Sequence, residues 1–229
     1  MPPLFTSFEE AWAWFTGGGD IGSMGRWRER FARGRGQLLS LQAPLEQRAA
    51  ADAILDVQDE LADVADLVMF TPEMLHVSVR GVGFQVIEKA HPGDVLRQDV
   101  ERVAQRAAKI IERAAPIEAT VGPINVFPDA LVMEVHEGGR LGELRAALAE
   151  ATADAFGIGD AQYLPHSTIA MFRSPEAAPA LRARLPALRG RPPARISIRS
   201  LEMARWWFTG IEAEDLPERD VVRTYRLRG

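Results

Sequence analysis

The sequence contains LHVSVRGVG at residues 75–83 and LPHSTIAMF at residues 164–172, and these two stretches indicate how the chain folds. Each holds a histidine followed two positions later by a hydroxyl residue: Ser78 follows His76, and Thr168 follows His166. The chain has 4 histidines and 16 serines and threonines among 229 residues. Two such pairs therefore arise by chance in only about a few per cent of chains of this composition. The pairs single out His76 and His166 as candidate functional residues.

Both stretches have the pattern of a β-strand. Side chains at positions i and i+2 of a strand share one face, so each histidine points the same way as its hydroxyl partner. The apolar side chains of Val77 and Ile169 suit the opposite, core-facing side. If two similar halves pack about a pseudo-twofold axis, two imidazoles and two hydroxyls converge in one groove. Such a set would suit cleavage of a phosphodiester. Histidine can act as acid or base near neutral pH, and the hydroxyls can donate hydrogen bonds to the phosphate oxygens.

The rest of the sequence predicts an α+β protein with two similar halves. Apolar residues at helical spacing predict helices over residues 45–66, 95–113, 140–156 and 175–188. Strands are expected over residues 37–43, 73–83, 117–126, 130–136, 162–172, 194–208 and 221–227. A similar succession of strands and helices thus occurs about twice along the sequence.

Residues 1–36 are predicted to form an N-terminal helical extension, and residues 37–229 the main domain. Ser7 and Glu10 have the spacing of a capping box at the start of a short helix over residues 7–16. An arginine-rich helical piece is expected to follow, within residues 26–35.

The composition excludes some classes of site and leaves others open. The chain has no cysteine, which excludes disulfides, thiol nucleophiles and thiolate metal sites. No HExxH-like ligand set occurs, so neither a metal nor another cofactor is expected. The sequence predicts no signal peptide or membrane span, and hence a cytoplasmic protein. Net charge is −5, although arginines gather in residues 26–35 and 182–199, either as solvated helix faces or as local phosphate-attracting groups.

With these residues in view, the sequence resembles the 2H phosphoesterase superfamily, which includes bacterial 2′-5′ RNA ligase-like proteins and RNA 2′,3′-cyclic phosphodiesterases. Residues 75–83 and 164–172 resemble its two histidine motifs, and PINVFPDALVMEV at residues 123–135 resembles its phenylalanine-proline turn and following strand. The resemblance implies a bilobal fold, in which each half has an antiparallel sheet and helices and the active-site groove lies between them. Ser167 is polar where the family has an apolar residue, so its strand face is expected to be less buried.

The resemblance implies a metal-independent phosphodiesterase that hydrolyses the 2′,3′-cyclic phosphate of an RNA 3′ end or of a small nucleotide. By analogy, His166 activates water as the base and His76 protonates the departing ribose oxygen, with the reverse assignment left open. Ser78 and Thr168 are expected to bind the phosphate. The alternative is an RNA-end or nucleotide-binding module, or a 2′-5′ RNA ligase, without physiological hydrolysis.

Four further residues are candidates for substrate contact, each with structural packing or solvation as the alternative. Arg80 follows Ser78 on the same strand face and would add positive charge near the phosphate. Tyr163, three residues before His166, would contact phosphate or base at the mouth of the groove. Phe127 and Trp206 would stack on a base, since aromatic faces bind bases with little sequence preference.

Overall fold

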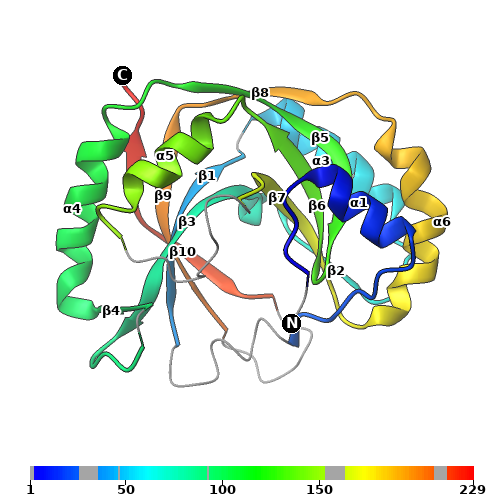
Figure 1. Ribbon diagram of the computed structural model, residues 1–229, viewed down its shortest axis with the longest axis horizontal. Helices are drawn as coiled ribbons and strands as arrows, with labels where there is room; N and C mark the ends of the chain where they lie inside the picture. The colour runs from blue at the N-terminus through cyan, green and yellow to red at the C-terminus, as the bar shows by residue number, and fades with distance from the viewer. Residues whose placement is uncertain (1–2, 26–35, 46, 92, 153–162, 209–215) are drawn as a thin grey trace.

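The computed structural model describes residues 3–25, 36–45, 47–91, 93–152, 163–208 and 216–229. Ten strands form one curved sheet, which helices flank (Figure 1). In chain order the strands are β1 (Leu38–Pro44), β2 (Leu67–Met69), β3 (His76–Val86), β4 (Asp94–Leu96), β5 (Ile117–Phe127), β6 (Ala130–His136), β7 (His166–Phe172), β8 (Ala194–Ile198), β9 (Ser200–Trp207) and β10 (Glu218–Arg226). The α-helices are α1 (Phe8–Thr16), α3 (Arg48–Glu60), α4 (Val100–Ile111), α5 (Arg140–Leu148) and α6 (Ala178–Arg189). The short 3-10 turns are η1 (Pro72–Met74), η2 (Arg97–Asp99) and η4 (Pro175–Ala177).

The sheet has two halves that meet at its centre. Its strand order is β10-β9-β1-β3-β7-β6-β5-β8, with β4 beside β3 and β2 beside β7. The strand pairs are antiparallel except for β3 with β4. β3 and β7 join through one register pair, Val77 opposite Ser167. Five strands therefore lie on each side of this junction, which confirms the predicted α+β fold with two antiparallel halves.

Helices cover both halves of the sheet, with α4 at the left of the molecule and α6 at the right (Figure 1). In the first half, α4 packs near β10 and α5 against β3; in the second half, α3 packs near β8 and α6 against β5. The apolar positions that predicted α3 are buried, including Ile54 and Val57. The helix is shorter than expected and ends at Glu60. The chain then turns to Asp66, whose φ is 66°.

Residues 3–25 pack against the second half. Ser7 caps the N-terminus of α1, and its Oγ accepts a hydrogen bond of 3.1 Å from the backbone N–H of Glu10, as the capping-box spacing predicts. The helix lies against β5, where the side-chain amide of Asn125 donates to the carbonyl oxygen of Phe8 at 2.9 Å. The helical piece expected within residues 26–35 lies outside the described residues, and the domain boundary near residue 36 stays a prediction.

Some predicted elements have different bounds in the structure. The strand predicted over residues 194–208 divides near Arg199 into β8, which pairs with β5, and β9, which pairs with β1. The chain crosses between halves at this point, which the continuous alternation of side chains does not reveal. The helix expected from Val95 begins at Val100, because β4 pairs with β3 just before it. The helix expected over residues 140–156 ends at Leu148, and part of the predicted range lies outside the described residues.

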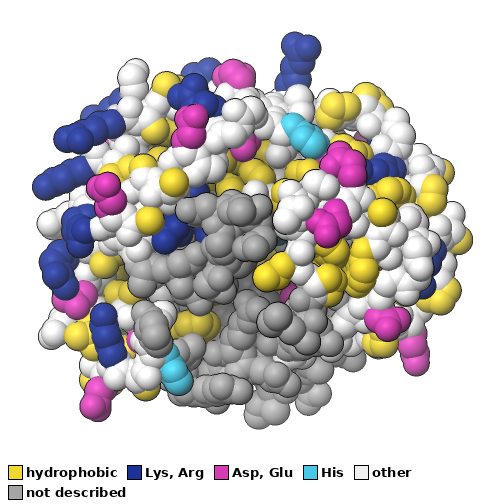
Figure 2. Space-filling view, in the orientation of Figure 1, with side chains coloured by type: hydrophobic (Ala, Val, Ile, Leu, Met, Phe, Trp, Pro, Cys, Tyr) yellow, Lys and Arg dark blue, Asp and Glu magenta, His cyan; other side chains and the backbone are white. Residues whose placement is uncertain are grey.

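The arginines of residues 182–199 have mainly structural contacts. Four of them bind carboxylates or backbone carbonyls: Arg182, Arg184, Arg189 and Arg191. This pattern favours a packing role for the group over phosphate attraction. Lys and Arg side chains also gather on the α4 side of the molecule (Figure 2).

Among the described helices, none is both long enough and apolar enough to cross a membrane.

Candidate active site

The centre of the sheet brings the two histidine motifs together. His76 and Ser78 on β3, and His166 and Thr168 on β7, are half-buried and line one cavity of about 370 Å³. Their neighbours at the alternate positions, such as Val77, are buried on the opposite face. Side-chain alternation therefore produces the predicted convergence, because β3 and β7 lie next to each other.

The expectation that Ser167 lies on a less buried face is wrong. Ser167 is 0% exposed, because its register pair with Val77 turns it into the core. Its hydroxyl oxygen has no hydrogen-bond partner in the part of the chain that the structure describes.

Both imidazoles are held in the same tautomer. His76 Nδ1 lies 2.6 Å from the carbonyl oxygen of Met74, and His166 Nδ1 lies 2.7 Å from that of Leu164. A carbonyl oxygen only accepts hydrogen bonds, so Nδ1 carries the proton in each neutral ring. Nε2 is then the basic nitrogen of both rings. That of His76 lies 3.0 Å from Ser78 Oγ, from which the neutral ring accepts a hydrogen bond.

Desolvation favours the neutral form of both histidines in the ligand-free protein. Desolvation, together with the positive charge of Arg219, lowers the pKa of His76 to about 4. Desolvation also lowers the pKa of His166, but the negative charge of Asp129 opposes that effect. A bound phosphate anion would raise the pKa of both rings, because a nearby negative charge favours the protonated form.

Tyr163 holds the backbone of the first motif. Its hydroxyl donates a hydrogen bond of 3.0 Å to the carbonyl oxygen of Ser78. The guanidinium carbon of Arg145 lies 5.0 Å from the centre of the Tyr163 ring. Tyr163 does line the cavity, but its contact with phosphate or base stays a prediction.

Arg80 lies in the cavity wall and is engaged by the protein. Its Nε donates to Thr152 Oγ1 at 2.7 Å, and its Nη1 donates to the carbonyl oxygen of Arg145 at 3.4 Å. Arg145 also lines the cavity, although sequence reasoning missed it. An arginine on a helix gives no signal that it is buried, so Arg145 resembles a solvated surface residue in the sequence. The two guanidinium groups make this wall positive, while a phosphate contact by Arg80 stays a prediction.

An aromatic ring lies next to each histidine. The ring centroids of Trp206 and His76 are 5.0 Å apart, and those of Phe127 and His166 are 4.7 Å apart. Trp206 is only 3% exposed, and its indole N–H donates to Ser40 Oγ at 3.1 Å. Trp206 therefore packs as a supporting residue beneath His76, while Phe127 is half-buried in the cavity wall. Base stacking on either ring stays a prediction.

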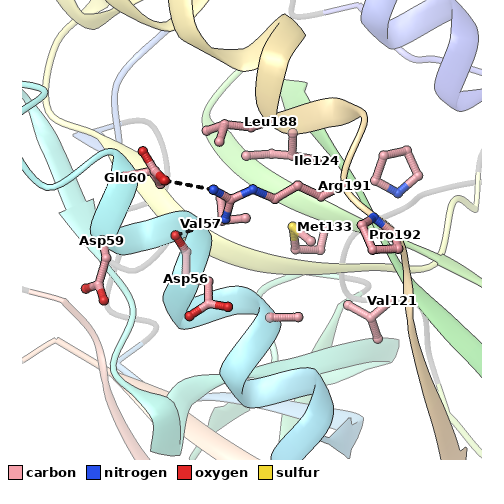
Figure 3. Close-up of a pocket in the computed structure, with 13 residues that line it drawn as sticks. Asp56, Val57, Asp59, Glu60, Val121, Ile124, Met133, Leu188, Arg191 and Pro192 are labelled. Carbon is pink, nitrogen blue, oxygen red and sulfur yellow. Dashed lines mark hydrogen bonds and ion pairs between the residues drawn. The ribbon is translucent and has the colours of Figure 1, made fainter.

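A second hollow, of about 700 Å³, lies between α3, β5 and α6 (Figure 3). Arg191 extends across it and pairs with Glu60 at 2.8 Å. Its lining contains no histidine and shares no residue with the cavity of the two motifs. Among the described residues, no group of three or more His, Cys, Asp or Glu side chains could hold a metal ion.

Comparisons with known proteins agree with this fold. The sequence profile of the 2′-5′ RNA ligase superfamily matches residues 40–207. The protein TT0787 of Thermus thermophilus is similar over 84% of this chain and 98% of its own, with a TM-score of 0.59 and 15% identity. E. coli LigT complexed with 3′-AMP is similar over 85% of this chain and 99% of its own, with a TM-score of 0.57 and 12% identity. At such identities the structural likeness shows the fold alone. No curated protein matches the chain.

Proposed function

Because this chain belongs to the 2′-5′ RNA ligase superfamily, the 2H phosphoesterases, we propose that it hydrolyses a 2′,3′-cyclic phosphate without a metal ion. The substrate is an RNA 3′ end or a small cyclic nucleotide. One observation carries this proposal: two imidazoles with the same tautomer line one cavity, each beside a hydroxyl two positions further along its strand. The solved complex of E. coli LigT with 3′-AMP supports a nucleotide as the class of ligand.

The proposed reaction is an in-line displacement at phosphorus. A water oxygen forms a bond to phosphorus while the bond from phosphorus to one ribose oxygen breaks. One histidine takes the proton of the water, and the other donates a proton to the departing ribose oxygen. Ser78 and Thr168 donate hydrogen bonds to the non-bridging oxygens, which requires Ser78 Oγ to exchange its bond to His76 for one to phosphate.

The surrounding charges favour His166 as the acid, the reverse of the assignment that the resemblance suggests. Asp129 favours a protonated His166, whereas Arg219 disfavours a protonated His76. The acid must be protonated before the reaction, and the base must not be. His76 is thus proposed as the base.

A substrate with an activated leaving group tests these roles. An aryl phosphodiester that releases p-nitrophenolate needs no proton donor for its leaving group, whereas a ribose oxygen does. We expect His166→Ala to lose much less activity on the aryl ester than on a 2′,3′-cyclic nucleotide. His76→Ala should lose activity on both substrates. Rescue of His76→Ala instead would reverse the roles.

The second candidate is a nucleotide-binding module or a 2′-5′ RNA ligase without physiological hydrolysis. One feature favours a binder: desolvation lowers the pKa of both histidines, which disfavours the protonated acid that hydrolysis requires. Incubation of the protein with each 2′,3′-cyclic nucleotide in EDTA, followed by analysis of the phosphate position in the product, separates the candidates. A nucleoside monophosphate product supports the phosphodiesterase. Absence of product together with measurable RNA binding supports the binder.

A further inference from the structure

The N-terminal segment, residues 3–25, contributes to the cavity of the two histidines. Pro3, Leu4 and Phe5 line this cavity together with Phe127 and His166. All three precede residue 40, where the match to the superfamily begins. This part of the wall therefore comes from a segment outside the matched region.

Aromatic rings link the N-terminal segment to the side of the cavity beside His166. The ring centroids of Phe5 and Phe127 are 6.1 Å apart. Those of Phe127 and His166 are 4.7 Å apart, in an edge-to-face arrangement. Phe8 stacks nearly parallel to Phe127, with an interplanar angle of 10°. A substrate group on this side of the phosphate would thus lie next to a cluster of aromatic rings.

The segment is fixed in place before any ligand binds. The carboxylate of Glu10 accepts a hydrogen bond of 2.7 Å from the backbone N–H of Thr6, which closes the turn after Phe5. The ring centroids of Phe5 and Trp14 are 5.3 Å apart. Trp14 lies so close to Gly19 that a Cβ atom at this glycine would be 2.3 Å from the indole. A preformed wall of this kind binds a ligand without the cost of ordering a loop.

Leu4 stands at the cavity with its side chain open to solvent. It is 57% exposed, and the other exposed large apolar residues in the described ranges, Ile87 and Val221, do not line the cavity. Covering apolar surface contributes roughly 25 cal/mol per Å². A ligand that reaches past the phosphate site would gain affinity from covering Leu4.

We infer that Leu4 and Phe5, together with Phe127, form a subsite for the nucleobase of the substrate, so that the N-terminal segment determines which phosphodiesters bind. This inference rests on the proposed function. A planar base suits the site better than an aliphatic group, because stacking on aromatic side chains contributes about 1–3 kcal/mol per base. The cavity of about 370 Å³ is near the lower end of small-ligand sites, about 300–1,000 Å³, and therefore suits a single nucleotide.

Equilibrium binding to the full-length protein tests the subsite apart from catalysis. Calorimetry would compare adenosine 3′-monophosphate with inorganic phosphate, which has no base. In the double variant Leu4→Ala/Phe5→Ala, we expect the Kd for the nucleotide to rise about tenfold, equivalent to about 1.4 kcal/mol. The Kd for phosphate should not change. Phe5→Leu keeps an apolar side chain but removes the ring, so it should lose most of the same affinity.

Trp12→Ala is the matched control. Trp12 lies on the same segment, but its ring packs 6.2 Å from Phe15 and 4.6 Å from the guanidinium carbon of Arg189, away from the cavity lining. We expect this variant to bind the nucleotide like the wild type. An unchanged nucleotide Kd in the double variant, or an equal loss for phosphate, would overturn the subsite.

Turnover of adenosine 2′,3′-cyclic phosphate by the same proteins is measured separately. If the wild type forms no product but the nucleotide Kd shifts as expected in the variants, the subsite stands and the proposed hydrolysis fails. If the wild type forms product and the variants bind the nucleotide as the wild type does, the hydrolysis stands and the subsite fails.

Discussion

The hydroxyl of Tyr163 tests how the first histidine motif is held. It donates a hydrogen bond of 3.0 Å to the carbonyl oxygen of Ser78, 85 residues away in sequence. Burial raises the pKa of Tyr163, so the hydroxyl keeps its proton and remains a donor at neutral pH. Because Ser78 Oγ in turn lies 3.0 Å from His76 Nε2, loss of the tyrosine hydroxyl should affect both stability and catalysis.

We expect Tyr163→Phe to lower the free energy of unfolding by about 1–2 kcal/mol. A hydrogen bond contributes about 1 kcal/mol net, and leaving the Ser78 carbonyl without this donor adds to the loss. The aromatic ring keeps its place 5.0 Å from the Arg145 guanidinium carbon. If positioning of Ser78 is worth about 1 kcal/mol in the transition state, kcat falls about fivefold. KM for a small cyclic nucleotide should stay nearly unchanged.

Urea unfolding, followed by tryptophan fluorescence, and steady-state kinetics measure these changes. Tyr225→Phe is the matched control, because the hydroxyl of Tyr225 has no hydrogen-bond partner among the described residues. Removing that hydroxyl should not lower stability. If Tyr163→Phe is as stable as the wild type and its KM rises instead, the hydroxyl binds substrate and does not position Ser78.

Three other predictions concern stability. The folded-state pKa of His76 is lowered to about 4 from 6.5, so the unfolded chain binds this proton more readily. The neutral His76 ring therefore makes a contribution to the free energy of unfolding that is complete above pH 6.5 and is lost as the pH falls toward 4. At pH 5 the loss of unfolding free energy is about 2 kcal/mol. Urea unfolding of the wild type and of His76→Gln, each at pH 7 and pH 5, should show this loss in the wild type only. Glu134→Ala should cost about 3 kcal/mol in urea unfolding, because it leaves the partner of a 2.6 Å ion pair, Arg189, without its carboxylate; a loss below about 1 kcal/mol would mean that solvent already screens the pair. Trp206→Phe should cost about 2 kcal/mol by removing a satisfied buried N–H; unchanged stability with weaker nucleotide binding would instead support a base contact.

The sequence allowed the centre of the fold to be predicted because its pattern is local. The spacing of His76 and Ser78 fixes a common strand face whatever the rest of the chain does. The same holds for His166 and Thr168, so the two motifs required only that their strands meet. The capping box at Ser7 was equally local, and the structure confirms its hydrogen bond to the backbone of Glu10.

Features that depend on distant contacts could not be predicted in the same way. Whether Arg145 lines a cavity depends on how α5 packs against β3, and the residues around it do not specify that packing. The division of the last predicted strand near Arg199 depends on partners in opposite halves of the sheet. Ser167 looked exposed because it is polar, yet its pairing with Val77 buries it.

The central claim is that His76 and His166 together perform acid/base catalysis. The most direct measurement is the turnover of a 2′,3′-cyclic nucleotide in EDTA by the wild type, His76→Ala and His166→Ala, with His91→Ala as the control, because His91 is exposed and does not line the cavity. Loss of a general acid or base costs about 10²–10⁴-fold. We therefore predict that each cavity variant loses at least about 100-fold in kcat while the control retains full activity. Near wild-type turnover by both cavity variants would contradict the two-histidine mechanism.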